Sequence, residues 1–186
     1  MKTLILISGK AGSGKDTFAR FLPDYKLYSF AGKVKEIAFK MGWNGYKDAR
    51  GRKFLQDIGT LAREYDEAVW VKKLCNILAN NGNYPEKVAI TDCRYPNEIE
   101  HMEKWAKHNG YTIATVRMER KNECNLTDEA KTHSSETALD DYTFQHVIIN
   151  NVSLEELEQY AKSIAEKVEG GKSLHEQFSR ACKHSG

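Results

Sequence analysis

The sequence predicts an α/β fold, in which a parallel sheet of about five strands is covered by helices on both faces. Two observations carry this prediction. Short apolar runs recur along the chain, and between them lie stretches whose apolar residues repeat at spacings of three and four. Strands that alternate with helices form parallel sheets. The chain has 186 residues, which is enough for one such domain and short of two ordinary ones.

The apolar runs are the predicted strands. The first, TLILIS, is continuous and ends at Gly9, as expected for a buried parallel strand. Ligands of open parallel sheets bind at the carboxyl ends of the strands. Gly9, Asp92 and Arg117 all fall at that edge. The five runs cover residues 3–8, 26–31, 87–91, 111–118 and 146–150.

The stretches between the strands are the predicted helices. Apolar residues at helical spacing from Phe54 to Leu78 indicate one long helix, or two helices broken near Asp66. Ser153 caps the last helix, with Glu156 as its capping-box partner. The other predicted helices cover 15–22, 33–42 and 96–108, with a charged loop over 43–53 and a polar segment over 119–135.

Charge and cysteine content exclude several classes of protein. The net charge is +2, from 28 basic and 26 acidic residues, and this balance does not favour a protein that coats nucleic acid. The four cysteines lie far apart without a C-x-x-C pair, so we expect reduced thiols in a cytosol rather than zinc or disulfides. No apolar segment approaches the length of a membrane span. We expect a cytoplasmic protein with neither nucleic acid nor membrane as a partner.

The stretch GKAGSGKDT, residues 9–17, is the strongest functional signal. It matches the phosphate-binding motif G-x-x-x-x-G-K-[ST] except at the last position, where Asp16 replaces the hydroxyl residue and Thr17 follows. It also follows a predicted strand and opens a helix, which is the context that the motif requires. The alternative is a turn with a solvated lysine.

This loop predicts contacts with a nucleoside triphosphate. The backbone N–H groups of Gly12, Ser13 and Gly14 are expected to bind β-phosphate oxygens, aided by the N-terminus of the following helix. Lys15 is expected to bridge the β- and γ-phosphates.

Residues after the third strand are candidates for the same site. Asp92 is expected to be a ligand of magnesium or of the acceptor, or else an N-cap or turn aspartate. Arg94 is expected to bind phosphate through two hydrogen bonds, or to be a surface charge. Glu98 is a weaker candidate for the site, because the helix dipole alone favours glutamate in the first turn of a helix.

Basic and aromatic residues elsewhere have two readings each. Arg63 is either a phosphate ligand or an exposed helix charge paired with Glu67, four residues on. Trp70 is either a core residue or a stacking platform for a base. Arg117 belongs to a basic group that is expected to neutralise the transferring phosphoryl group, or to lie in solvent. His133 is either an acid–base residue or a polar residue at a helix start, and the second is preferred because phosphoryl transfer to a phosphate acceptor needs no strong base.

Several stretches together resemble one family, the phage-type deoxynucleoside monophosphate kinases. They are, in order, GKAGSGKDT, KFLQDIGTLAREYDEAVWVKKL, TDCRYPNEIE, HSSETALDD and VIINNVSLEEL. The resemblance covers roughly residues 4–168. The second and third stretches narrow it to this family, because a phosphate-binding loop alone occurs in many others.

The resemblance implies a three-layer P-loop kinase fold over residues 1–169, with a lid at about 119–135 and an unassigned tail over 170–186. It implies transfer of the γ-phosphoryl group of ATP to a deoxynucleoside 5′-monophosphate, with Mg²⁺, in the cytosol of a bacterium or phage-infected host. Small-molecule nucleotides are the expected partners, and a homodimer is left open. The family also carries lysine–aspartate at the end of its loop, so Asp16 is consistent with a working site and is expected to hold Mg²⁺, with Thr17 assisting.

The phosphate-binding motif, the basic group that contains Arg117 and the resemblance together give the expected site residues. The expected ATP-binding set is Gly9, Gly12, Ser13, Gly14, Lys15, Asp16 and Thr17. The expected acceptor-binding set is Lys10, Lys35, Arg63, Trp70, Asp92, Arg94 and Glu136. The expected catalytic set is Lys15, Asp16, Asp92 and Arg117.

Two rival functions stay open. One is a P-loop kinase for another small phosphorylated metabolite, similar to animal-type phosphomevalonate kinase, which also has a lysine–aspartate loop. Trp70 and the long-helix stretch argue against it. The other is a regulatory protein that binds ATP without transferring phosphate. A set of acceptor cations such as Lys10, Arg63 and Arg94 would have no purpose in that protein.

Overall fold

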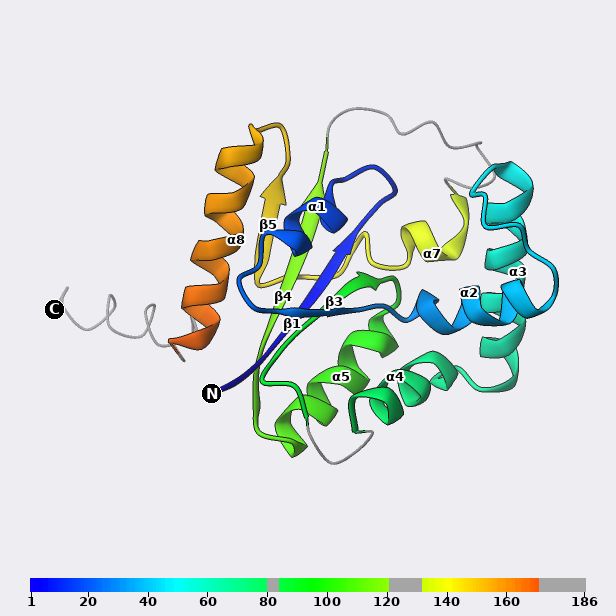
Figure 1. Ribbon diagram of the computed structural model, residues 1–186, viewed down its shortest axis with the longest axis horizontal. Helices are drawn as coiled ribbons and strands as arrows, with labels where there is room; N and C mark the ends of the chain where they lie inside the picture. The colour runs from blue at the N-terminus through cyan, green and yellow to red at the C-terminus, as the bar shows by residue number, and fades with distance from the viewer. Residues whose placement is uncertain (80–83, 121–131, 171–186) are drawn as a thin grey trace, which may run out of the picture.

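Five strands form one parallel sheet, as the sequence predicts, in the computed structural model (Figure 1), which describes residues 1–79, 84–120 and 132–170. The strand order is β2-β3-β1-β4-β5. Every neighbouring pair is parallel. The strands are β1 (Lys2–Gly9), β2 (Lys26–Tyr28), β3 (Lys87–Cys93), β4 (Tyr111–Glu119) and β5 (His146–Ile149).

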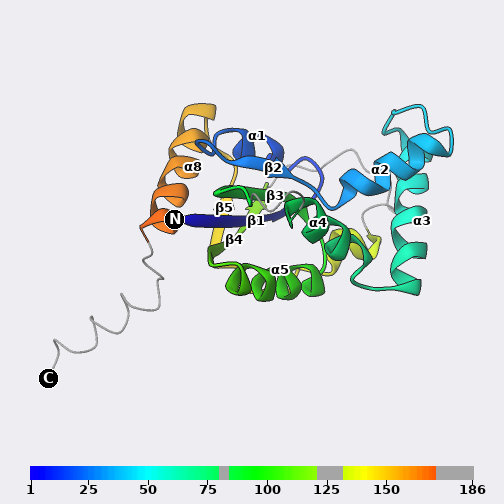
Figure 2. The same ribbon diagram turned by 60° about the horizontal axis from the view of Figure 1, so that its bottom comes forward.

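The first strand is central because its apolar residues bury on both faces. Leu4 and Leu6 belong to the core under α4 (Val69–Ala79) and α5 (Pro96–His108). Ile5 and Ile7 belong to the core under α1 (Lys15–Arg20) and α8 (Leu154–Glu169). Successive side chains of the strand point to opposite faces of the sheet, so β1 contributes to both cores. The result is three layers, with the sheet between two layers of helices (Figure 2).

The helices α2 (Ala31–Lys40) and α3 (Ala49–Tyr65) lie outside these layers. In Figure 2 they extend to the right, beyond the end at which β1 finishes. A short helix, α7 (Ser134–Thr137), lies at the same end of the molecule (Figure 1). This end is the carboxyl edge of the sheet, where the sequence predicts the site.

The long helical signal is resolved as two helices, α3 and α4, separated at Asp66. Asp66 has an extended backbone, with φ −149° and ψ 105°. Its carboxylate accepts a hydrogen bond from the N–H of Ala68 at 3.1 Å. An aspartate side chain that binds the backbone two residues on competes with the helix, so the first helix ends here.

The predicted strand over 26–31 ends at Tyr28, because helix α2 begins at Ala31. Two other predicted boundaries are wrong for reasons that lie in capping contacts. The helix predicted to begin at residue 33 begins at Ala31, since the Asp92 carboxylate of another strand binds its first N–H groups. The predicted loop over 43–53 ends in helix α3 because Asp48 caps it, accepting from the N–H of Gly51 at 2.7 Å. The predicted capping box of Ser153 and Glu156 is confirmed.

Part of the predicted lid, residues 121–131, lies outside the described residues, as do residues 171–186 of the predicted tail. The predicted domain bounds of 1–169 stay a prediction. Across the described ranges, no helix has both the length and the apolar character needed to span a membrane.

Candidate active site

A cavity of about 410 Å³ lies between the phosphate loop and the helices α2, α3 and α7. It gathers most of the predicted acceptor-binding and catalytic residues, although they come from five separate parts of the chain. The predicted residues that line it are Lys15, Asp16, Lys35, Arg63, Asp92, Arg94 and Glu136.

The phosphate loop has the backbone that its glycines predict. Gly14 has φ +90°, a conformation that favours glycine, and an added Cβ would collide with the side chain of Asn150. Asn150 holds the loop from the β5 side by donating to the Ser13 carbonyl at 2.9 Å. The N–H of Ser13 donates to the Lys10 carbonyl at 3.2 Å, so this predicted phosphate donor is engaged within the loop.

Lys15 and Asp16 project from the start of α1 into the cavity wall. Burial lowers the pKa of Lys15, and the positive charge of Arg94 lowers it further. A lysine in this environment gains most from a bound anion, since an anion offsets both effects. Thr17 does not line the cavity.

The Asp16 carboxylate suits Mg²⁺ as a ligand. Within the described residues, the Asp16 carboxylate has no hydrogen bond or ion pair to another side chain, and no group of three acidic, histidine or cysteine residues is arranged to hold a metal. Mg²⁺ prefers oxygen ligands and is often held by one or two carboxylates together with substrate phosphates. Asp16 therefore fits as a single protein ligand, and the metal would supply charge neutralisation on the phosphates.

Asp92 is a structural contact as well as a cavity residue. Its two carboxylate oxygens accept from the N–H groups of Phe30 at 2.8 Å and Ala31 at 2.9 Å. Burial raises the pKa of Asp92, while these two N–H groups act in the opposite direction. Asp92 is thus a cap, but for helix α2 rather than for the helix that follows it in sequence.

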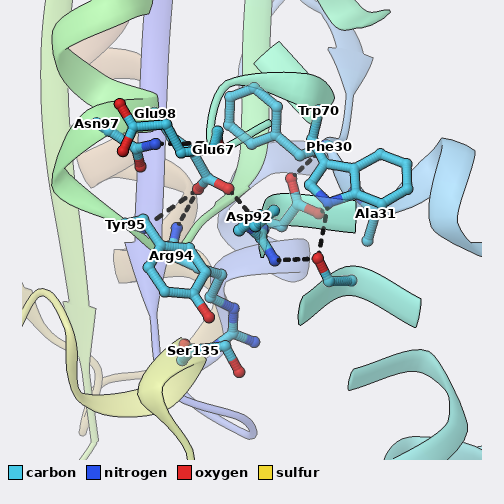
Figure 3. A network of polar contacts seen from close by, with 12 residues as sticks. Phe30, Ala31, Glu67, Trp70, Asp92, Arg94, Tyr95, Asn97, Glu98 and Ser135 are labelled. Carbon is cyan, nitrogen blue, oxygen red and sulfur yellow. Dashed lines mark hydrogen bonds and ion pairs between the residues drawn. The ribbon is translucent and has the colours of Figure 1, made fainter. Parts of the chain in front are cut away.

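The two predicted phosphate-binding arginines both contact Glu98, which Figure 3 shows beside Arg94. Arg63 donates from Nη2 to Oε1 of Glu98 at 2.9 Å, and the backbone N–H of Arg94 donates to Oε2 at 2.8 Å. Burial raises the pKa of Glu98, and the charge of Arg63 opposes that rise. The alternative pairing of Arg63 with Glu67 is wrong, because the side chain turns towards α5 instead.

Helix α7 brings Glu136 against the phosphate loop. Glu136 accepts from the Ala11 N–H at 3.1 Å and pairs with Nη1 of Arg94 at 2.8 Å. His133 caps this helix, as its reading as helix-start polarity predicts, and Nδ1 accepts from the Ser135 N–H at 3.2 Å. Burial lowers the pKa of His133.

Three of the predicted acceptor-binding and catalytic residues do not line the cavity. Trp70 is 2% exposed, belongs to the core and donates from Nε1 to the Gly59 carbonyl at 3.2 Å. Its expected contact with the acceptor is therefore corrected to a core role. Lys10 pairs with Asp140 at 2.8 Å, and Arg117 is buried, bonded to Ser8 at 3.1 Å and to the same Asp140 at 2.9 Å.

The sequence reasoning missed a row of residues on α3 and the loop before it. Lys47, Arg52, Gln56 and Gly59 line the cavity together with Arg63. Residues 52, 56, 59 and 63 share one face of a helix by their spacing. The available signal was Gly59, because a glycine inside a helix usually has a packing or functional reason. Burial lowers the pKa of Lys47, as does the charge of Lys35.

Comparisons by sequence find one curated relative at 30% identity and no family. No protein-family model matches the chain. "Uncharacterized protein ORF77" of Ictalurid herpesvirus 1 (strain Auburn) is 30% identical over 160 residues, or 82% of this chain. The chain spans 65% of that relative's length.

Two solved structures are similar at low sequence identity. A putative kinase from Chloroflexus aurantiacus has a TM-score of 0.52 and 12% identity, over 92% of this chain and 98% of that one. The tunicamycin resistance protein of Deinococcus radiodurans has a TM-score of 0.49 and 12% identity, over 87% and 94%. With the parallel five-stranded sheet and its two helical layers, the chain has the three-layer P-loop kinase fold that its sequence predicts.

Proposed function

We propose that this protein is an ATP-dependent kinase that transfers the γ-phosphoryl group of ATP to a nucleoside 5′-monophosphate, with deoxynucleotides as the first candidates. One observation carries the proposal. The lysine of the phosphate loop and two arginines from other elements, Arg63 and Arg94, line one cavity. A protein that only binds ATP has no use for a second set of cations opposite its phosphate loop.

The charges of the cavity support a phosphorylated acceptor. A monophosphate is close to a dianion at neutral pH, and Arg63 and Arg94 are suited to bind its oxygens through paired N–H groups. Lys35, Lys47 and Arg52 add positive charge at the same wall. Both reactants are anionic, so the site must first overcome their mutual repulsion, and these cations do so.

The uncharged part of the wall supports a base. Phe30, Val34 and Leu55 give an apolar surface, and Gln56 gives an amide that both donates and accepts hydrogen bonds. A nucleobase has an apolar face and a polar edge, so it matches this combination. With Trp70 in the core, these residues take over the role that the sequence assigned to the indole.

The proposed reaction needs positioning rather than a strong base. An acceptor phosphate oxygen is already ionised and attacks the γ-phosphorus, while the bond from that phosphorus to the β–γ bridging oxygen breaks and ADP leaves. Lys15 stabilises charge on the β- and γ-phosphates, and Arg94 lies near enough to Lys15 to lower its pKa. The two residues therefore flank the region in which the phosphoryl group would pass.

A kinase for another small phosphorylated metabolite is the second candidate. The specific observation in its favour is the burial of Trp70, because the indole was the main argument for a base. The cations of the cavity suit any phosphomonoester, and only Gln56 and the apolar wall favour a nucleotide.

A coupled ADP-release assay tests both candidates. The panel contains all ribo- and deoxyribonucleoside monophosphates, with mevalonate phosphate as the non-nucleotide acceptor. The nucleotide proposal expects ADP release that depends on at least one nucleoside monophosphate and is lost in Lys15→Ala. Release with mevalonate phosphate alone supports the second candidate. ATP hydrolysis that ignores every acceptor overturns both.

A further inference from the structure

We propose that Glu98 is a positioning residue of the acceptor site, a single buried carboxylate that fixes Arg63 and Arg94 relative to each other. The role rests on the proposed function for its meaning, because the two arginines are the proposed acceptor ligands. The geometry on which it stands does not depend on the identity of the acceptor.

The Glu98 carboxylate is completely engaged. Its side chain is 1% exposed. Oε1 accepts from Arg63 Nη2 at 2.9 Å. Oε2 accepts from the N–H groups of Arg94 at 2.8 Å and Tyr95 at 3.2 Å (Figure 3). One oxygen thus holds a side chain of α3, and the other holds the backbone from which the Arg94 side chain departs.

Helix capping accounts for only one of these three contacts. In a capping box the side chain at the third helical position accepts from the N-cap N–H, which here belongs to Tyr95. Arg94 precedes the cap, and Arg63 is 35 residues away on another helix. Glutamine serves equally well in a capping box, and burying a carboxylate is unfavourable without a partner. The negative charge therefore serves the arginine.

The other contacts of Arg63 make its position well defined. Nη1 donates to the Gly59 carbonyl at 3.2 Å, and the guanidinium lies 4.3 Å from the centre of the Tyr95 ring. Tyr95 is itself bonded to Glu98 through its backbone. These contacts fix the plane of the Arg63 guanidinium. The guanidinium can therefore bind a phosphate without a further loss of side-chain freedom, which is how preorganised groups gain affinity.

The substitution Glu98→Gln separates positioning from capping. The amide keeps one accepting oxygen and replaces the other with an NH₂ donor, so it can hold the backbone N–H groups or Arg63, but not both. We expect the acceptor KM to rise about tenfold or more, as for loss of a buried hydrogen bond to a charged group. The ATP KM should stay within about twofold of the wild type, which corresponds to less than one RT unit of change.

The matched control is Glu100→Gln, on the same helix and exposed. It removes the same charge from α5 without touching either arginine, so its kinetic constants should equal those of the wild type. If the acceptor KM rises equally in both variants, the cause is the total negative charge on α5 rather than the contacts of Glu98, and the proposal is overturned.

A double variant covers the case in which Glu98→Gln does not fold. Arg63→Ala with Glu98→Gln removes both charges together, so no buried charge is left unpaired. If Glu98 acts through Arg63, adding Glu98→Gln to Arg63→Ala changes the acceptor KM by less than about threefold, since coupled sites are not additive. A rise of the acceptor KM clearly beyond threefold over Arg63→Ala contradicts the proposal, as does an unchanged acceptor KM in a folded Glu98→Gln variant.

A spectroscopic readout separates this proposal from the proposed function. In ¹H–¹⁵N spectra of the arginine side chains, the Nε–Hε signal of Arg63, assigned with Arg63→Lys, should shift and broaden in Glu98→Gln but not in Glu100→Gln. An unshifted signal overturns positioning whether or not the protein is a kinase. A shifted signal with no acceptor turned over by the wild type supports positioning and refutes the proposed function.

Discussion

Four carboxylates line the cavity, and their protein contacts divide them into two kinds. Asp92 binds the backbone of α2, Glu98 binds Arg63, and Glu136 binds Arg94. In the described part of the chain, Asp16 is the only one of the four whose carboxylate has neither a hydrogen bond nor an ion pair to another protein group. At the scale of single residues, three acids therefore hold protein groups in place, and Asp16 remains for a ligand.

Asp16 is expected to hold Mg²⁺, and two substitutions test this. Asp16→Asn keeps the shape and loses the charge, so it should lower activity and raise the magnesium concentration needed for half-maximal turnover. Asp16→Ser should retain more activity, since a hydroxyl ligates Mg²⁺ in ordinary phosphate loops. Magnesium titrations of turnover measure both.

The competing account for Asp16 is its favourable place in the first turn of α1, which is worth roughly 0.3–1 kcal/mol. That account expects a lower melting temperature for Asp16→Asn and an unchanged magnesium midpoint. An unchanged midpoint in both variants would leave Thr17 as the better candidate.

Lys15→Ala should abolish transfer and leave the fold intact. The ammonium stabilises charge on the β- and γ-phosphates, and a charge-stabilising donor of this kind is worth about 3 kcal/mol, or more than a hundredfold in kcat. Lys40→Ala, an exposed lysine at the end of α2, is the control. If Lys15→Ala transfers phosphate within a few-fold of the wild type, the loop is not a phosphate site.

At the scale of elements, α3 and α4 are joined at one carbonyl group. The oxygen of Gly59 on α3 accepts from Trp70 on α4 and from Arg63 on α3 itself. The glycine leaves this oxygen accessible to both donors, because a Cβ there would lie 3.3 Å from Nη1 of Arg63. The joint connects the core beneath the sheet to the cavity wall.

Trp70→Phe tests whether Trp70 belongs to this joint or to the acceptor site. The change removes the hydrogen bond to Gly59 and part of a buried ring, so the unfolding free energy should fall by about 1–3 kcal/mol. The acceptor KM should stay within a few-fold of the wild type. Denaturant melts and steady-state kinetics measure the two effects. A large rise in the acceptor KM at unchanged stability would restore the stacking role.

At the scale of the whole molecule, pH should act on stability through two partly buried histidines. Burial lowers the pKa of His146, at the start of β5, and of His133 at the cap of α7. The unfolded chain then binds more protons than the native state from about pH 6.5, the ordinary histidine pKa, down to the lowered values. In that window, stability should fall as the pH falls.

His146→Gln should reduce this loss. Melting temperatures between pH 7.5 and pH 5.5 should decline less steeply in the variant, because one of the two groups no longer titrates. His108→Gln, on the exposed end of α5, is the control and should decline as the wild type does. A variant slope equal to that of the wild type would remove His146 from the pH response.

The sequence by itself determined the order of strands and helices and the phosphate loop. These are local properties. A continuous apolar run such as TLILIS must be buried. Gly14 adopts a positive φ, a backbone conformation that residues with a side chain rarely adopt. The break at Asp66 was also visible as one of two options, because an aspartate competes locally with a helix.

Only the tertiary structure decided which charged and aromatic side chains share the cavity. Helical spacing places Arg63 and Glu67 on one face, yet Arg63 binds Glu98 of α5. Asp92 caps a helix about sixty residues earlier in the chain, and Trp70 turns inwards. Each of these outcomes is a contact between distant segments, and its free energy depends on burial and on partners that no sequence window contains.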